Sequence, residues 1–95
     1  MAAYVIVNIE VTDPVRYEEY KKMAVATVTA HGGRYIARGG HAEMLEGTWR
    51  PQRVVLLEFP SAQNAKDWWA SEAYKPAKAL RQASARTEMM LVEGI

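Results

Sequence analysis

The 95-residue sequence contains no cysteine. This absence excludes disulfide bonds, thiolate nucleophiles, iron–sulfur clusters and cysteine-ligated zinc together. It fits a reducing compartment, and the first residues, Met1-Ala2-Ala3-Tyr4, lack a charged segment and a cleavage site. We therefore expect no signal peptide and a cytoplasmic location. No apolar run approaches the roughly 18 residues that a membrane helix requires, so we expect no membrane association.

The sequence also lacks a clear excess of positive or negative charge, and it contains few metal-ligating side chains. Twelve Lys and Arg stand against eleven Asp and Glu, whereas a nucleic-acid binder usually carries a basic stripe. The two histidines, His31 and His41, do not form a spaced ligand pair. Phosphate-binding, dinucleotide-binding and nucleophilic-serine motifs are absent. We expect no nucleic-acid partner, no metal and no cofactor.

The apolar patterns that are present divide the chain into strands and helices. Strands are predicted at residues 4–11, 34–38, 53–59 and 87–92, and pairing of the second strand is expected to resume over 41–45 after a bulge at Gly39-Gly40. Helices are predicted from 14 to about 31, and from 62 to about 84 with a kink or break near Pro76. Asp13-Pro14 and Ser61 mark the helix starts, and Gly32-Gly33 ends the first helix.

This order predicts one α+β domain over residues 1–95, a ferredoxin-like βαββαβ sandwich with an antiparallel sheet and helices on one face. The first strand is apolar on both sides: Val5 and Val7 alternate with Tyr4 and Ile6. Helices cover one face only, so we expect a homodimer across the bare sheet face. The side chains expected to be mostly buried are Val5, Val7, Ile36, Val55, Leu57, Met89 and Leu91.

Glu58 is a lone carboxylate inside an apolar strand, which is costly unless it is paired. Its expected partners are Arg38, at the end of the second strand, and Arg81, which shares a helical face with Tyr74. We predict that Glu58, Arg38, Arg81 and Tyr74 form the polar, catalytic end of a pocket between helices and sheet, with Glu58 as the base. The alternative is a structural ion pair with no cavity beside it.

Bulky side chains on the predicted helices supply the candidate wall of this pocket. Tyr20 and Trp68 are predicted to contact a substrate, and His41, after the glycine pair, is a third candidate. Packing in the core and at the dimer interface is the competing explanation for the aromatic residues.

Several short motifs follow one another in order along the chain. They are His31-Gly32-Gly33-Arg34-Tyr35, Ala37-Arg38-Gly39-Gly40, Leu45-Glu46-Gly47, Leu57-Glu58-Phe59-Pro60, Ser71-Glu72-Ala73-Tyr74, Leu80-Arg81 and Val92-Glu93-Gly94. With these motifs the chain resembles, over essentially its whole length, the DUF1330 family of uncharacterised bacterial proteins. That family is similar to the other members of the dimeric α+β barrel superfamily, which implies a ferredoxin-like protomer whose sheet packs against its partner's sheet.

The resemblance implies several activities rather than one. The superfamily includes cofactor-independent monooxygenases, haem-degrading enzymes, muconolactone isomerase-like proteins and proteins with no known activity, and it assigns no catalytic residue here. Three hypotheses follow. The protein is a monooxygenase- or isomerase-like enzyme acting on a small organic molecule, a non-catalytic module that binds or senses a small ligand, or a purely structural dimer.

Overall fold

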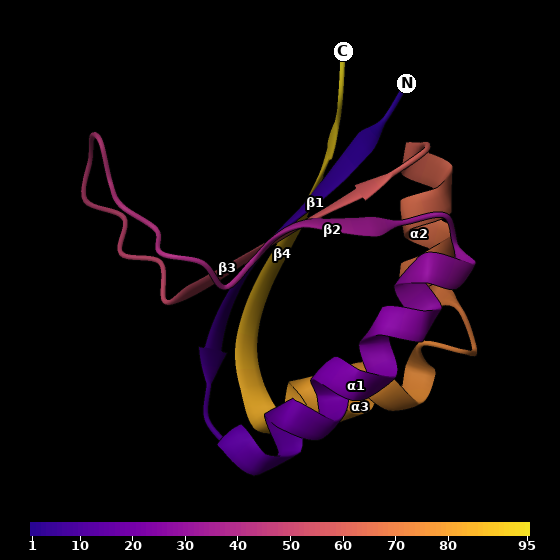
Figure 1. The fold of residues 1–95 in the computed structure, drawn as a ribbon, viewed down its shortest axis with the longest axis horizontal. Helices are drawn as coiled ribbons and strands as arrows, with labels where there is room; N and C mark the ends of the chain where they lie inside the picture. The colour runs from indigo at the N-terminus through magenta and orange to yellow at the C-terminus, as the bar shows by residue number, and fades with distance from the viewer.

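The computed structural model describes all residues 1–95 and shows a four-stranded sheet with helices on one face (Figure 1). The elements are β1 (Ala3–Val11), α1 (Pro14–Ala30), β2 (Arg34–Arg38), β3 (Arg53–Phe59), α2 (Ala62–Ala70), α3 (Lys75–Ser84) and β4 (Ala85–Glu93). The sheet order is β2-β3-β1-β4, and every neighbouring pair is antiparallel. The predicted ferredoxin-like fold is confirmed. None of the helices combines the length and apolar character needed to cross a membrane.

The first helix begins and ends at the residues that the sequence indicated. The carboxylate of Asp13 accepts a hydrogen bond from the backbone N–H of Arg16 and so caps α1. At the other end Gly32 adopts a φ of +77°, a conformation that glycine reaches without steric cost. The chain then turns directly into β2.

The second helical region is divided into α2 and α3, as the sequence suggested. Ser61 caps α2, its hydroxyl accepting from the backbone N–H of Asn64. Ser71 caps only the short turn between the two helices, where its hydroxyl accepts from the N–H of Tyr74. Pro76 lies in the first turn of α3, where its missing N–H removes no helical hydrogen bond. The break therefore comes before Pro76 and not at it.

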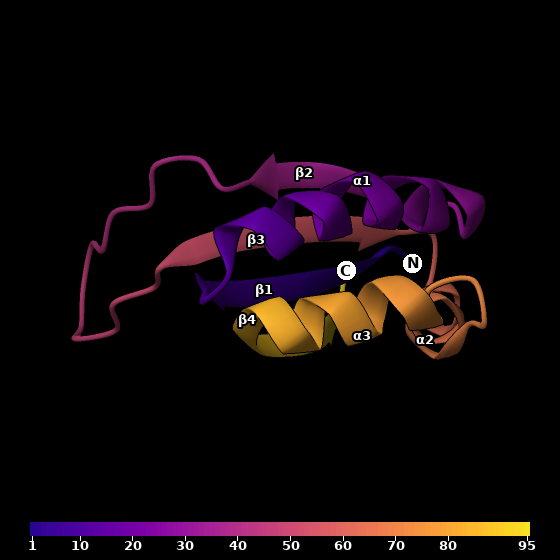
Figure 2. The same ribbon diagram turned by 90° about the horizontal axis from the view of Figure 1, so that it is seen from below.

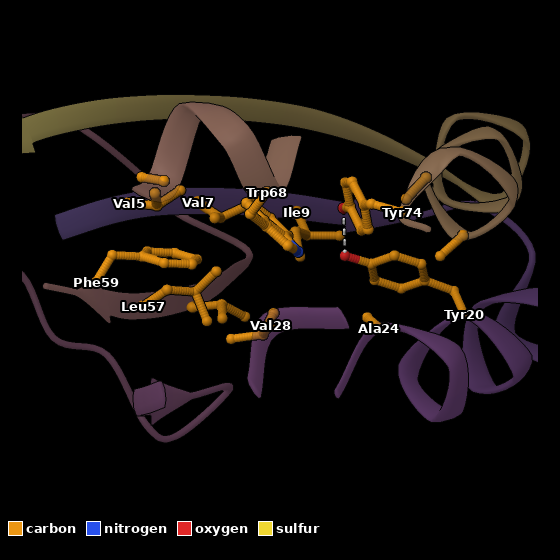
Figure 3. Packing of buried hydrophobic residues seen from close by; sticks show 14 of the residues in the cluster. Val5, Val7, Ile9, Tyr20, Ala24, Val28, Leu57, Phe59, Trp68 and Tyr74 are labelled. Atoms are coloured by element: carbon orange, nitrogen blue, oxygen red, sulfur yellow. Dashed lines mark hydrogen bonds between the residues drawn. The ribbon is translucent and has the colours of Figure 1, made fainter. Parts of the chain in front are cut away.

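The core lies between the sheet and the helices (Figure 3). On the strand side it contains Val5, Val7, Ile9, Val55, Leu57 and Phe59. The helices contribute Tyr17, Tyr20, Ala24, Val28, Ala65, Trp68, Tyr74 and Ala77. The burial predicted for Val5, Val7, Val55 and Leu57 is confirmed, while Met89 and Leu91 are half-buried against this core. Ile36 was predicted wrongly: it lies at a register shift in edge strand β2 and is 43% exposed.

The other side of the sheet, which we call the open face, carries the second apolar set of the strands. Its members are Tyr4, Ile6, Ile36, Val54, Leu56, Met90 and Val92. No helix covers them (Figure 1). Two ion pairs, Arg34–Glu58 and Arg86–Glu10, lie among the polar residues of this face.

Residues 40–50, which we call the arm, project away from the helices (Figures 1 and 2). Every residue of the arm is exposed, including Leu45 at 98% and Trp49 at 51%. The strand pairing predicted over residues 41–45 is therefore wrong. The last backbone hydrogen bond between the two strands is the one that the Gly39 N–H donates to the Val54 carbonyl. Pro51, which precedes β3, has no N–H with which to extend this pairing.

Candidate functional site

A cavity of about 540 Å³ opens between α2, α3 and the β4 side of the sheet. This size falls within the range of small-molecule sites. Its lining residues are Val5, Ala65, Lys66, Trp68, Trp69, Ala70, Arg81, Gln82, Thr87, Met89 and Leu91, of which seven are hydrophobic. The site is thus an apolar pocket with few polar groups.

The lining divides into a buried floor and an exposed mouth. Val5, Ala65 and Trp68 are nearly inaccessible to solvent, whereas Lys66 and Trp69 are exposed. Lys78 holds Trp69 in place, with its Nζ 3.8 Å from the indole ring centroid. The same Nζ donates a 3.0 Å hydrogen bond to the Trp69 carbonyl. The aromatic ring at the mouth is therefore fixed by a cation–π contact as well as by its backbone.

Arg81 is the buried charged residue of the cavity. It lies in the last turn of α3, only 4% of it is exposed, and its Nε has no hydrogen-bond partner. None of the ion pairs in the protein includes it. A guanidinium cannot shed its proton at accessible pH, so the positive charge remains in the pocket.

A second polar group on the lining is also unpaired. The Thr87 hydroxyl, from β4, is buried without a hydrogen-bond partner. The only charged residues on the lining are Lys66 and Arg81, and no carboxylate balances them. The cavity therefore combines apolar walls, a net positive charge and two unsatisfied polar groups.

Trp68 forms a rigid wall between the cavity and the core. Its ring packs on Tyr74 with centroids 4.3 Å apart and on Phe59 at 5.5 Å. Its Nε1–H donates to the Thr27 hydroxyl at 3.1 Å, so the ring cannot rotate without breaking a partly buried hydrogen bond. Figure 3 shows this ring between Phe59 and Tyr74.

Behind Trp68, two tyrosine hydroxyls meet in the core. The Tyr20 and Tyr74 oxygens are 2.9 Å apart, and both side chains are buried (Figure 3). Burial raises the pKa of the Tyr20 hydroxyl far above its ordinary value, and the neighbouring Tyr74 raises this pKa further. Tyr20 is therefore protonated throughout the physiological range and acts as a hydrogen-bonding group, not as a base.

Glu58 lies on the other side of the sheet from this cavity. In β3 the side chains of Val55, Leu57 and Phe59 face the helices, so the intervening Glu58 points to the open face. Its Oε1 accepts a 2.7 Å hydrogen bond from Arg34 Nε, and this bond lowers the pKa of the carboxyl. The prediction that Glu58 meets Arg81 or Arg38 at one pocket is wrong, because its partner is Arg34 on the adjacent strand.

The other predicted site residues are distributed over three places. Arg38 is exposed on the edge strand, with its guanidinium 4.5 Å from the Tyr35 ring centroid. It lines a separate cavity of about 20 Å³, together with Tyr20, and that space suits a single water. His41 lies in the exposed arm. Arg81 and Trp68 line the large cavity, and Tyr74 supports Trp68 from behind.

Sequence reasoning did not identify Thr87 or Lys66, and it predicted Met89 only as a buried residue; Trp69 was among the helix aromatics considered as a grip on a flat ligand. A signal for Thr87 exists, because it stands two residues before Met89 and four before Leu91, on the helix-facing side of β4. A hydroxyl in an inward-facing apolar series indicates a polar contact inside the protein. Nowhere do three or more His, Cys, Asp or Glu side chains gather in an arrangement able to hold a metal ion.

The sequence and the fold were compared with known protein families and solved structures. A family model described as "Domain of unknown function (DUF1330)" matches residues 2–95. The chain is similar to the structure of RPA0582, a protein of unknown function from Rhodopseudomonas palustris. The TM-score is 0.81 at 16% identity, over 99% of this chain and 82% of that one. No curated protein matches the sequence.

Two further solved structures share the architecture. SnoaB, a cofactor-independent oxygenase from Streptomyces nogalater, has a TM-score of 0.69 at 12% identity, covering 99% of this chain and 93% of that one. A dimeric ferredoxin-like protein of unknown function from Jannaschia sp. CCS1 has a TM-score of 0.67 at 14% identity, covering 99% and 100%. At these identities the likeness establishes the fold and leaves the activity open.

Proposed function

This chain belongs to the DUF1330 family, a domain of unknown function, and we propose that it binds a small organic molecule in the cavity and transforms it without a cofactor. The reaction would be of the monooxygenase or isomerase kind. The observation that carries this proposal is the 540 Å³ cavity, with its apolar walls and the buried guanidinium of Arg81. The similarity to an oxygenase that works without a cofactor supports it at the level of fold.

The chemistry available to such an enzyme follows from the lining. A fixed positive charge in an apolar pocket stabilises negative charge that develops on a substrate oxygen when a proton leaves an adjacent carbon. In an isomerase that proton returns to a different carbon of the same molecule. In a monooxygenase the electron pair left behind forms a carbon–oxygen bond to dioxygen, and the proton goes to the outer oxygen to give a hydroperoxide. Loss of water from this hydroperoxide then leaves a carbonyl group on the substrate carbon.

A ligand-binding or sensing module is the second candidate, and one observation favours it. The lining contains no carboxylate, imidazole or thiol that is placed to act as a general base. A substrate would therefore have to be acidic enough to ionise in the field of Arg81 alone. Binding without turnover makes no such demand.

A thermal-shift screen of small aromatic and quinone-like compounds tests ligand binding. A ligand present at about 100 times its dissociation constant adds about 2.7 kcal/mol of stability, which raises the melting temperature measurably. Dioxygen uptake and mass spectrometry of the hits then separate turnover from binding alone. If no compound raises the melting temperature, the binding proposal fails.

Two substitutions by tryptophan, one at the cavity mouth and one outside the lining, test whether a hit binds in the cavity. Ala70 lies at the cavity mouth, and Ala73 lies outside the lining, while both are exposed. Ala70→Trp is expected to narrow the mouth and weaken binding of any hit, whereas Ala73→Trp is expected to leave binding unchanged. Equal binding by both variants would place the ligand elsewhere.

We also infer that two copies pair through the open face. An uncovered apolar patch with polar residues around it is characteristic of an interface, and the similar protein from Jannaschia is described as dimeric. The arm, which contains the exposed Leu45 and Trp49, leaves the sheet on the side away from the helices (Figure 1), so a copy seated on the open face would have the arm within reach. Contact with the arm would remove two large apolar side chains from water.

A further inference from the structure

Arg81 is a buried cationic residue whose Nε has no hydrogen-bond partner, and no ion pair of the protein neutralises its guanidinium. Arg16, Arg34 and Arg86 each pair with a carboxylate, although all three are far more exposed. Arg38 and Arg53 lie over the rings of Tyr35 and Tyr17, although the Nε of Arg53, like that of Arg81, has no hydrogen-bond partner. Arg81 has neither kind of partner, and it is the most buried of the charged residues.

Burial without a partner has a definite energetic meaning. Removing an ionised group from water costs several kcal/mol unless another charge or hydrogen-bonding groups replace the water. Because Arg81 keeps its charge, this cost is recovered when an anion enters the cavity. The apolar walls would strengthen that attraction, since they keep the local dielectric low.

We infer that the ligand of this cavity is an organic anion, an aromatic or similarly flat molecule whose carboxylate or phenolate oxygen binds Arg81. The Thr87 hydroxyl, unpaired on the same lining, donates to the anionic group. The body of the molecule lies against Trp68, Met89 and Leu91. This inference rests on the proposed function, because it requires the cavity to be a ligand site.

The rest of the lining supports the same sign of charge. Lys66, at the mouth, is the second cation, and the lining includes no acidic side chain that would repel an anion or compete for Arg81. A cationic ligand would meet the like charge of Arg81 inside the cavity and that of the exposed Lys66 at its mouth. A neutral ligand would leave the Arg81 charge as costly as before. An anion alone satisfies both the apolar walls and the guanidinium.

Matched pairs of probes test the charge directly. Benzoate is compared with benzyl alcohol, and 2-naphthoate with 2-naphthalenemethanol, by calorimetry at pH 7.5. Each pair has nearly the same apolar body and differs in the negative charge. We expect at least one carboxylate to bind and to do so 10- to 100-fold more tightly than its alcohol. Equal affinity within a pair that binds overturns the inference and leaves the proposed function standing. If none of the four compounds binds, both the inference of an anionic ligand and the proposed function fail.

Two variants assign the effect to Arg81. Arg81→Met retains the apolar stem of the side chain and removes the guanidinium with its charge. It is expected to lower the affinity for the carboxylate at least tenfold and to leave the alcohol nearly unaffected. Lys66→Met removes the other cation of the lining and is expected to cost less than threefold. An unchanged carboxylate affinity in Arg81→Met would overturn the inference.

A milder variant guards against a folding defect at the buried position. Thr87→Val is isosteric and removes only the unpaired hydroxyl, so it is expected to fold and to weaken carboxylate binding several-fold. If Thr87→Val binds as the parent does and Arg81→Met is unfolded, Arg81→Lys decides. Lysine retains the positive charge but lacks the planar guanidinium that binds a carboxylate with two hydrogen bonds. If the Arg81→Lys variant bound the alcohol as tightly as the carboxylate, that result would count against an anion site.

Discussion

At the scale of single residues, the buried polar groups of this protein differ in whether they have a hydrogen-bond partner. The two tyrosines satisfy one another through a hydroxyl contact of 2.9 Å. Arg81 has no such partner, and its Nε is left without a hydrogen bond. The first arrangement contributes to stability, whereas the second reduces it; under the proposal of an anion site, that loss would be a trade for binding of the kind common at functional sites.

Arg81→Met is expected to stabilise the ligand-free protein. Replacing an unpaired buried charge by a shorter apolar side chain removes a desolvation cost, and we expect a gain of about 1–3 kcal/mol in the free energy of unfolding. Urea denaturation without ligand measures it. A loss of stability of that size would show that the guanidinium has a structural role.

The Tyr20–Tyr74 contact is expected to show strong non-additivity. Tyr20→Phe leaves the Tyr74 hydroxyl buried without a partner and is expected to cost about 1–3 kcal/mol. Tyr74→Phe does the reverse at similar cost. The double variant leaves no unpaired hydroxyl and is expected to be less destabilised than the sum of the two, in a double-mutant cycle by urea denaturation. Simple additivity would mean that the two hydroxyls do not depend on each other.

Alkaline pH is expected to destabilise the fold through buried tyrosines. Burial raises the pKa of Tyr20 and of Tyr35 above the value of about 10 for an unfolded tyrosine. The unfolded chain therefore loses these protons first, so the stability they provide is complete below pH ~10 and declines as pH rises above it. Absorbance of tyrosinate at 295 nm should show these residues ionising together with unfolding. Early ionisation of all five tyrosines in the folded protein would contradict this.

At the scale of elements, the turn from α1 into β2 leaves no room for a side chain at Gly33. A Cβ at Gly33 would lie 2.6 Å from the Phe59 ring and 2.8 Å from Val28. Gly40, seven residues later, has open space around it. The two glycines of this region therefore have different reasons to be present, although in the sequence they look alike.

Gly33→Ala is expected to destabilise the protein by about 1–3 kcal/mol, because α1 and β3 must separate to admit a methyl group. Gly40→Ala is the matched control, and its effect is expected to stay within about 0.5 kcal/mol. Thermal unfolding resolves the difference, since 1 kcal/mol corresponds to roughly 4–8 °C for a domain of this size. Equal melting temperatures for the two variants would refute the close packing at Gly33.

At the scale of the whole molecule, the sheet separates two apolar surfaces with different uses. One packs on the helices and contains the cavity, and the other is the open face. A single protomer this small buries a limited share of its surface, so an apolar face left in water is a substantial cost. The proposed pairing of two copies would remove that cost.

A charge at the centre of the open face is expected to separate the dimer. Ile6 lies on central strand β1 opposite Leu56 and Met90. Ile6→Lys should give a mass near 10.7 kDa by light scattering at micromolar concentration, while the parent shows twice that value. Val15→Lys is the control, since Val15 is 73% exposed on α1, away from this face. A parent protein that is already monomeric would remove the pairing proposal.

Local patterns in the sequence determined the order of the elements and most of their ends. Asp13, Ser61 and Gly32 act through their immediate neighbours, so their effects are visible without the fold. The apolar alternation in β1 and β3 also showed correctly that both sheet faces are apolar. It did not show which face the helices cover, because either choice buries a similar set of side chains.

Tertiary structure alone decided the site. The parity of β3 places Glu58 on the open face with Arg34 and leaves Arg81 in the cavity with no carboxylate. Both outcomes depend on which strand lies beside which and on how α3 docks, and these are contacts between residues far apart in the chain. A sequence shows that an arginine will be buried when its helical face is apolar, but only the packed molecule shows that nothing inside the protein neutralises it.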